Sequence, residues 1–339
     1  MRWLFLAVAL IAVAFAAIVL LDDVTSDPET LAADPNPDSP YRMFALGDSY
    51  ISGEGADNYL PGTDETGEPG RNLCHRAATA YPHLAARSLG VSLTFVACSG
   101  AKTEDVTGVS AGGEEVGGQY PDAPSDVFGA RPQVDVLAEA AAGDEERRPD
   151  LVLIGIGGND AGFAKLGVAC GSPVGNCGSP KSADRWLGGL DAVVHPALTR
   201  TYARVREAAG NGVPVFAFTY PNPFGPEFCD DLFGVIEPEM TFIRDRFLPQ
   251  LNRTVESAAR AAGVRVIDLS HALDGHRFCD GPLSAAAINF VKLGRTRGAQ
   301  IDPRSLHRGS LHPSPLGHRL IEAEVMAELR AARRAAGAG

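Results

Sequence analysis

The sequence has no excess of basic residues. Its 30 Lys and Arg stand against 42 Asp and Glu, which gives a formal net charge of -12 over 339 residues. This balance argues against a nucleic-acid partner, because neutralising phosphates requires a basic surface. It also argues against docking on anionic lipid headgroups by charge. With 45% hydrophobic residues, the composition is that of a folded globular protein with a sizeable core.

The sequence also lacks the spacings that are typical of metal ligands. No Cys-x-x-Cys occurs, and Cys170 and Cys177 lie too far apart for a zinc knuckle. The histidines show no ligand spacing either. We therefore expect neither a metal nor another cofactor.

Charged residues are absent from Trp3 to Leu21. This apolar run nearly reaches the ~20 residues that span a bilayer. Arg2 precedes it and Asp22-Asp23 follow it, so the N-terminus should stay inside and the rest of the chain should be exported. A cleaved signal peptide is the alternative, because Ala14-Phe15-Ala16 has the small-x-small pattern. Cleavage there would leave an apolar new terminus. We therefore favour an uncleaved signal-anchor, formed by residues 1–21, rather than a cleaved signal peptide.

The rest of the chain divides into a linker, one domain and a short tail. Residues 22–40 contain four prolines and several acids, which predicts a disordered linker. The domain should span 41–334, and the Ala/Gly tail at 335–339 should fray. Three long stretches rich in Gly, Pro and acids exceed ordinary loop lengths and are expected to be lids or binding loops: 54–73, 108–130 and 281–311.

Short apolar runs alternate with helical patterns. Apolar residues recur every three or four positions over 187–205 and 240–258, which predicts helices, with weaker patterns over 76–89 and 133–142. A last helix should begin after Pro313 and Pro315. Alternation of this kind predicts a parallel sheet with helices on both faces. The five expected strands are Met43–Leu46, Leu93–Ala97, Leu151–Ile156, Val215–Thr219 and Val264–Leu269.

Polar groups follow three of these strands and precede the last helix. In open parallel sheets, ligands bind beyond the carboxyl ends of the strands. A hydroxyl, a glycine amide, a side-chain amide and an imidazole are thereby expected on one rim. They are the parts that acyl transfer needs: a nucleophile, a base and donors to an oxyanion. The segments are Gly47-Asp48-Ser49-Tyr50, Cys98-Ser99-Gly100-Ala101, Gly157-Gly158-Asn159-Asp160 and His312-Pro313.

Four sequence blocks resemble, in order, the signature blocks of SGNH (GDSL-like) hydrolases. They are Phe44–Gly55, Ala97–Ala101, Ile156–Phe163 and Leu311–His318, and they span nearly the whole domain. The cysteine spacing and the phrase Cys74–Tyr81 are most similar to the disulfide-bearing actinobacterial esterase and lipase branch.

The resemblance implies a role for each polar group. Ser49 would be the nucleophile and His312 its base. The N–H groups of Ser49 and Gly100 and the side-chain amide of Asn159 would form the oxyanion hole. It also implies a three-layer, flavodoxin-like α/β fold with a five-stranded parallel sheet.

We therefore expect a carboxylic ester hydrolase, an esterase or lipase that works through an acyl-enzyme. Its substrate would be an acyl lipid or an acylated glycan, and the protein would be a monomer outside the cytoplasm, tethered by its N-terminal segment. One alternative is a polysaccharide O-acetyl esterase. Another is a non-catalytic envelope-binding module that has kept the fold.

Several residues have competing interpretations. Ser49 and Asn159 could be turn or cap residues, and Asp48 and Asp160 are read as local capping groups. Gly108-Val-Ser110-Ala-Gly112 matches a nucleophile elbow but lies in a polar, glycine-rich stretch rather than between a strand and a helix. Two further histidines compete with His312 for the role of base, namely His307 and His318.

No acidic residue lies three positions before His312, where many SGNH enzymes have an aspartate. Gly309 occupies that position and Ser310 follows. We expect a backbone carbonyl of Gly309 or Ser310 to fix the imidazole, as in the related esterase branch. A distant acid, Asp302 or Asp280, is the alternative.

Six cysteines in an exported chain indicate disulfides, and six allow 15 pairings. We predict that neighbours pair, as Cys74–Cys98, Cys170–Cys177 and Cys229–Cys279. The first two would close short loops at the catalytic rim. The third would join the loops after the fourth and fifth strands, which should be adjacent.

Overall fold

A five-stranded parallel sheet forms the centre of the folded unit, in the order β2-β1-β3-β4-β5. Its strands are β1 (Arg42–Gly47), β2 (Ser92–Phe95), β3 (Leu151–Gly155), β4 (Val215–Phe218) and β5 (Arg265–Ile267). The structure, a computed structural model, describes residues 34–64, 72–110, 131–144, 148–170, 177–229, 235–290, 293–295, 301–306 and 309–337.

The central strands are apolar on both faces because helices cover both sides. Met43–Leu46 of β1 and Val152–Ile154 of β3 are almost fully buried. Parallel strands buried in this way read as continuous apolar runs, which is why the sequence predicted all five. The order of the strands reverses beside β1, and ligands bind at such a reversal in open α/β sheets.

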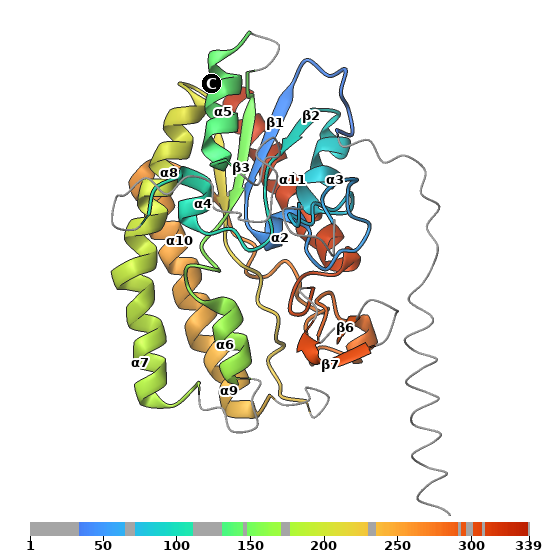
Figure 1. Cartoon of the computed structure of the whole chain (residues 1–339), viewed down its shortest axis with the longest axis vertical. Coiled ribbons are helices and arrows are strands. Elements are labelled where there is room, and N and C mark those ends of the chain that lie inside the picture. Colours follow the sequence, from blue (N-terminus) through green and yellow to red (C-terminus); the bar gives the residue numbers. More distant parts are fainter. Residues whose placement is uncertain are drawn as a thin grey trace, which may run out of the picture. The chain divides into compact units, whose positions relative to one another are not determined.

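The helices form a layer on each face of the sheet (Figure 1). On one side α3 (Tyr81–Leu89) packs against α11 (Pro315–Gly337). On the other side α8 (His195–Ala209) packs between α5 (Gln133–Ala142) and α10 (Leu248–Ala262). The remaining helices are α2 (Ser49–Ser52), α4 (Thr103–Thr107), α6 (Phe163–Cys170), α7 (Pro180–Gly189) and α9 (Glu237–Phe242), with a 3-10 turn, η4 (Leu283–Ala285).

The two strongest helical patterns are each interrupted by a π-helical turn. Between α7 and α8 the turn is η2 (Leu190–Val194), and between α9 and α10 it is η3 (Ile243–Phe247). Pro196 and Pro249 lie two residues beyond these turns. Because proline cannot donate a backbone hydrogen bond to the preceding turn, the helix changes its bonding pattern there.

The folded unit begins earlier than residue 41. The Asp34 carboxylate accepts from Leu93 N at 3.0 Å and from Ser92 Oγ at 2.8 Å. The Asn36 side chain donates to the carbonyls of Ala86 and Val91, each at 3.1 Å. The end of the expected linker is therefore docked on β2 and α3. The contacts that hold it are polar, so a search for apolar patterns in the sequence did not find them.

Two other expected boundaries differ. The stretch 281–311 was expected to be irregular, but it contains an antiparallel pair, β6 (Leu293–Arg295) and β7 (Ile301–Leu306). The last helix continues to Gly337, although a tail was expected from 335. Alanine has the highest helix propensity, which favours the continuation of α11 through this alanine-rich end.

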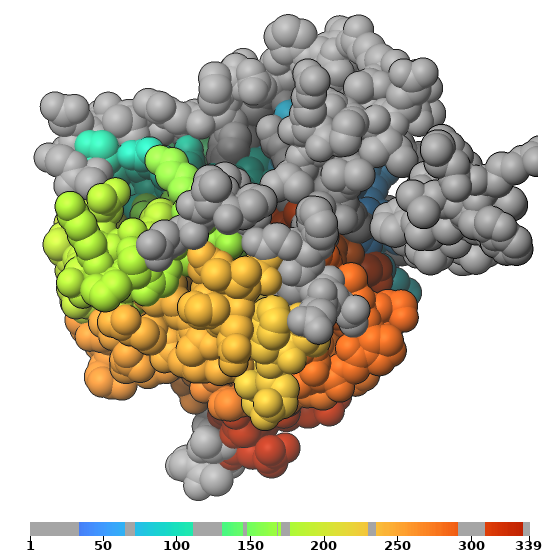
Figure 2. All heavy atoms as spheres, turned by 90° about the horizontal axis from the view of Figure 1, so that it is seen from below, coloured from blue at the N-terminus to red at the C-terminus, as the bar shows by residue number. Residues whose placement is uncertain are grey.

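The three predicted disulfides are confirmed. Cys74 pairs with Cys98, Cys170 with Cys177, and Cys229 with Cys279. Figure 2 shows the end of the unit where the yellow surface around α9 adjoins the orange surface of the segment after β5.

The apolar segment 3–21 lies outside the described residues. Among the residues that are described, no helix is both long and apolar enough to cross a membrane.

We predict that the disulfides differ in their contribution to stability. A cross-link removes more entropy from the unfolded chain when it closes a longer loop. Replacing Cys229 and Cys279 by Ala should lower the free energy of unfolding by about 4 kcal/mol, and replacing Cys170 and Cys177 by about 2.5 kcal/mol. Denaturant unfolding of the two double variants would measure both values. A larger loss for the Cys170/Cys177 variant would contradict this ranking.

Candidate active site

Ser49 lies at the carboxyl end of the central strand. After β1 the chain turns at Gly47, whose φ of 130° is unfavourable for other residues. A Cβ at Gly47 would also collide with the carbonyl of Gly155 on β3. Asp48 then caps the short helix α2, because its carboxylate accepts from Tyr50 N at 3.0 Å. This turn places Ser49 as the first residue of α2, 7% exposed at the rim.

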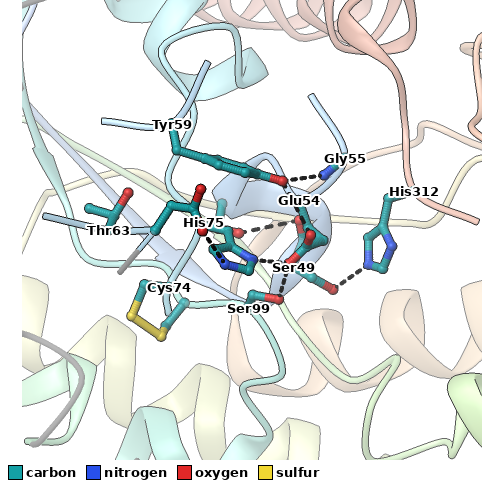
Figure 3. Close-up of polar contacts among 12 residues, drawn as sticks. Ser49, Glu54, Gly55, Tyr59, Thr63, Cys74, His75, Ser99 and His312 are labelled. Carbon is teal, nitrogen blue, oxygen red and sulfur yellow. Dashed lines mark hydrogen bonds and ion pairs between the residues drawn. A yellow bond between two sulfur atoms is a disulfide. The ribbon is translucent and has the colours of Figure 1, made fainter. Parts of the chain in front are cut away.

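His312 faces Ser49 across the rim. Its Nε2 lies 2.8 Å from Ser49 Oγ (Figure 3), and its Nδ1 lies 2.9 Å from the carbonyl oxygen of Ser310. A carbonyl can only accept, so Nδ1 carries the proton and Nε2 is free to accept from the serine hydroxyl. The predicted serine and histidine are thus brought together, with a main-chain carbonyl as the third group.

The backbone beside His312 is strained. Leu311 has a φ of 61°, a conformation that is uncommon for a side chain of this size. The hydroxyl of Tyr50 donates to the Leu311 carbonyl at 2.8 Å, and Leu311 N donates to the carbonyl of Asn289 at 2.8 Å. These bonds hold the turn in which the Ser310 carbonyl points back to the imidazole.

Asn289 also links His312 to the segment after α2. Its Nδ2 donates to the carbonyl of Gly55 at 2.8 Å and to that of His312 at 3.2 Å. Gly55 has a φ of 84°, and a Cβ there would lie 3.0 Å from His312 Cβ and 2.9 Å from the Gly309 carbonyl. Only glycine therefore lets the two segments approach this closely.

The other two predicted groups lie on the neighbouring strand ends. Gly100 follows β2, is exposed and has a φ of 86°. Asn159 follows β3, and its Nδ2 donates to the Ala101 carbonyl at 2.9 Å, which ties the two loops together. The Asp160 carboxylate accepts from Thr103 N at 3.1 Å and from the Thr103 hydroxyl. It therefore caps the start of α4, in line with the expected local capping role.

A buried tyrosine connects Asp48 to the loop of Asn159. The Tyr220 hydroxyl donates to Asp48 Oδ2 at 2.7 Å and accepts from Gly158 N at 2.7 Å. Burial raises the pKa of Asp48 to about 7. Tyr220 follows β4 and was not predicted as a site residue, because only the fold shows that it lies beside β1 and β3.

A second unpredicted group lies behind the site. Glu54 is fully buried, and its carboxylate contacts His75, Ser99 and Tyr59 (Figure 3). Glu54 belongs to the first signature block and Ser99 to the second, so their presence was visible in the sequence. Their contact with each other and with His75 was not, because it depends on how the loops after β1 and β2 meet.

The competing residues have other surroundings. His318 is fully buried, stacks on Tyr81, and has a pKa lowered to about 3, chiefly by burial. Asp280 is paired with Arg277 at 2.9 Å. Ser110 comes shortly after helix α4 rather than after a strand, so the elbow motif lacks its required context. His307 lies outside the described residues, as does the side chain of Asp302.

A small apolar recess adjoins the rim. Its walls come from α6, from the segment after β4, from η3 and from the turn before His312. The lining residues are Phe163, Leu166, Gly167, Pro223, Phe224, Ile243 and Leu311. Within the described ranges, no group of three or more His, Cys, Asp or Glu side chains is arranged to hold a metal ion.

Known proteins match this chain in sequence and in structure. Residues 45–320 match the GDSL-like lipase/acylhydrolase family. Lipase 2 of Streptomyces coelicolor is 30% identical over 271 residues, which cover 77% of this chain and 79% of that protein. The crystal structure of phospholipase A1 from Streptomyces albidoflavus NA297 superposes with a TM-score of 0.60 at 25% identity, covering 86% of this chain and 98% of that one.

An extracellular lipase from Streptomyces rimosus shares the fold, with a TM-score of 0.61 at 23% identity over 86% of this chain and 99% of that one. The five-stranded sheet, the three disulfides and the match over most of the chain agree with one another. The chain therefore belongs to the GDSL-like lipase/acylhydrolase family and is a carboxylic ester hydrolase.

Proposed function

We propose that Ser49 is the nucleophile of this esterase and that His312 is its general base. The observation that carries the proposal is the pair of contacts made by one imidazole: Nε2 to Ser49 Oγ at 2.8 Å and Nδ1 to the Ser310 carbonyl at 2.9 Å. The second contact fixes the tautomer that the first one needs, and a nucleophile, a base and an orienting group in line are the requirement for serine catalysis.

The reaction then has two halves. Ser49 Oγ forms a bond to the acyl carbon while its proton passes to His312 Nε2, and the carbonyl π electrons move onto oxygen. When that tetrahedral intermediate collapses, the C–O bond to the alcohol breaks and His312 gives its proton to the departing alkoxide. Water attacks the acyl-enzyme by the same route, and the acid and free Ser49 are released.

Three donors serve the oxyanion in this proposal. They are the N–H groups of Ser49 and Gly100 and the side-chain amide of Asn159. All three follow adjacent strands of one sheet, and the Asn159 amide donates to the Ala101 carbonyl. Preorganised donors of this kind contribute the largest part of catalysis in many acyl-transfer enzymes.

A neutral carbonyl replaces the usual carboxylate beside His312. It orients the ring, but it stabilises the imidazolium less than a negative charge would. The alternative, a distant acid, receives no support from Asp280, whose carboxylate is engaged by Arg277 through both backbone and side chain.

We predict that Ser49→Ala and His312→Ala abolish ester hydrolysis, whereas Asp280→Asn and Asp302→Asn change kcat only slightly. In a serine triad, loss of the acid lowers kcat on the order of 10⁴-fold. Steady-state kinetics on a short-chain ester would measure all four variants, and thermal unfolding would verify that each one folds. A 10⁴-fold fall in either folded Asp variant would show that a carboxylate completes the site.

We further propose an acyl lipid as the substrate, rather than an acetylated glycan. The apolar recess beside Leu311 supports this choice, because it lies next to the residue that precedes His312 and is lined by apolar residues and one glycine. The matching proteins from Streptomyces are named as lipases and a phospholipase A1. A longer acyl chain would bury more apolar surface against this lining than an acetyl group would, and each buried methylene adds about 0.8 kcal/mol.

We predict that filling the recess reduces the preference of the enzyme for long acyl chains over acetyl groups. A Cβ at Gly167 would lie 3.1 Å from Leu311 Cδ1, so Gly167→Val would narrow the recess. The ratio of kcat/KM for an octanoyl ester to that for an acetyl ester should fall about tenfold, which corresponds to the loss of roughly two methylene contacts. Gly188→Val is the matched control, because open space surrounds Gly188 on α7. A wild-type enzyme that prefers acetyl esters would contradict the proposal.

We propose that the domain works outside the cytoplasm, tethered by segment 3–21. Three disulfides support an oxidising compartment. The full-length protein should require detergent for its extraction from cell envelopes. A mature N-terminus between Ala16 and Asp34, found by N-terminal sequencing, would show that the segment is cleaved instead.

A further inference from the structure

Glu54 is a buried carboxylate directly behind the rim. Its side chain is fully buried, and three groups surround it: His75 Nδ1 at 2.5 Å, Ser99 Oγ at 2.7 Å and Tyr59 OH at 3.2 Å. The reaction proposed above uses none of these groups. A buried carboxylate is unfavourable unless it is paired and hydrogen-bonded, so this arrangement needs a physical reason.

His75 is the counter-ion of Glu54. Its Nε2 lies 3.3 Å from Asp64, so the imidazole is held between two carboxylates. Burial opposes both charges, but the contacts with Asp64 and Glu54 raise the pKa of His75, and the contact with His75 lowers the pKa of Glu54. His75 also has a φ of 46°, which is uncommon for a residue other than glycine. Strained residues of this kind cluster at functional sites.

Ser99 connects this ion pair to the loop after β2 that carries Gly100. Its hydroxyl donates to Glu54, and its N–H donates to the Cys74 carbonyl at 3.0 Å. The disulfide between Cys74 and Cys98 ties the residue before Ser99 to the residue before His75. The next residue after Ser99 is Gly100, whose φ of 86° lies in the left-handed region. Gly100 thus directly follows a residue that is anchored by its hydroxyl, its N–H and the neighbouring disulfide; Figure 3 shows the contact of Ser99 with Glu54.

The ion pair contributes more to placement than to stability. Buried ion pairs often contribute nothing to the free energy of unfolding compared with well-packed apolar residues. A carboxylate acceptor nevertheless binds a serine hydroxyl more strongly than a neutral group does, and it fixes the direction of that hydroxyl. Displacement of a reacting or stabilising group by about 1 Å can reduce a rate on the order of 100-fold.

We propose that Glu54 is a positioning residue, which acts through the Ser99 hydroxyl to hold the Gly100 N–H where the oxyanion forms, with His75 as its counter-ion. This inference rests on the proposed function, because it assumes that Ser49 and Gly100 have the roles given above. Glu54 touches neither the substrate nor the reacting atoms in this account.

The test is a double-mutant cycle of Glu54→Gln, Ser99→Ala and the double variant. Glu54→Gln keeps the shape and removes the charge, and Ser99→Ala removes only the hydroxyl. Each single variant should lower kcat roughly 10- to 100-fold while KM changes little, because an interaction with the transition state is lost. The double variant should be no slower than the slower single variant, since both changes remove the same connection. Thermal unfolding and kcat are measured for every protein.

Glu239→Gln is the matched control. Glu239 is a buried carboxylate that accepts from Ile236 N at the start of its own helix, away from the rim, so kcat should stay within about twofold of wild type. If the Glu54 variant does not fold, Ser99→Ala decides alone, because loss of a hydroxyl leaves the packing intact.

Two results would overturn the proposal: a folded Ser99→Ala or Glu54→Gln enzyme with wild-type kcat, or fully additive losses in the cycle. An active Ser49→Ala enzyme would instead refute the proposed function itself. Loss of all activity in Ser49→Ala together with wild-type kcat in Glu54→Gln would reject only the role of Glu54.

Discussion

The hydrogen bond from His312 Nδ1 to the Ser310 carbonyl is the interaction on which the proposed site depends. It selects the tautomer that presents Nε2 to Ser49, and it spans a turn in which Leu311 adopts a positive φ. The hydroxyl of Tyr50 and the backbone of Asn289 maintain this turn, so the residue after the proposed nucleophile helps to shape the proposed base.

The parallel sheet explains how residues far apart in the sequence come together in the proposed site. Three adjacent strands end at one edge, and each end supplies one group: Ser49 after β1, Gly100 after β2 and Asn159 after β3. Buried and partly buried polar contacts then connect these ends to one another. Tyr220 joins Asp48 to Gly158, Asn159 joins Ala101, and Glu54 joins Ser99. The rim is thus held by hydrogen bonds between side chains as well as by apolar packing.

The sequence predicted the parts of the molecule that short-range patterns determine. Buried strands appear as apolar runs, and Ser49, Gly100, Asn159 and His312 stand directly beside those runs or before the last helix. The cysteine pairs could also be predicted, because each pair lies within one loop or in loops that are neighbours in the expected topology. The remainder depends on contacts between distant segments. Asp34 docks on β2 through a carboxylate, which no hydrophobic pattern can reveal.

The contact of Glu54 with His75 and Ser99 was hidden for a related reason. His75 lies between the expected loop 54–73 and the weak helical pattern over 76–89. Its contact with Glu54 depends on the close approach of the loops after β1 and β2. Tyr220 likewise appears in the sequence as the residue after a strand, without any sign that β4 places it near Asp48. Which polar residue meets which is decided by the three-dimensional arrangement and not by local spacing.

Covalent labelling with a fluorophosphonate, followed by peptide mass spectrometry, tests the central claim most directly, since only an activated serine reacts. We predict a single adduct on Ser49 in the wild-type protein and no adduct at the same exposure time in His312→Ala. An adduct on Ser99 or Ser110 in place of Ser49, or undiminished labelling of Ser49 without His312, would contradict it.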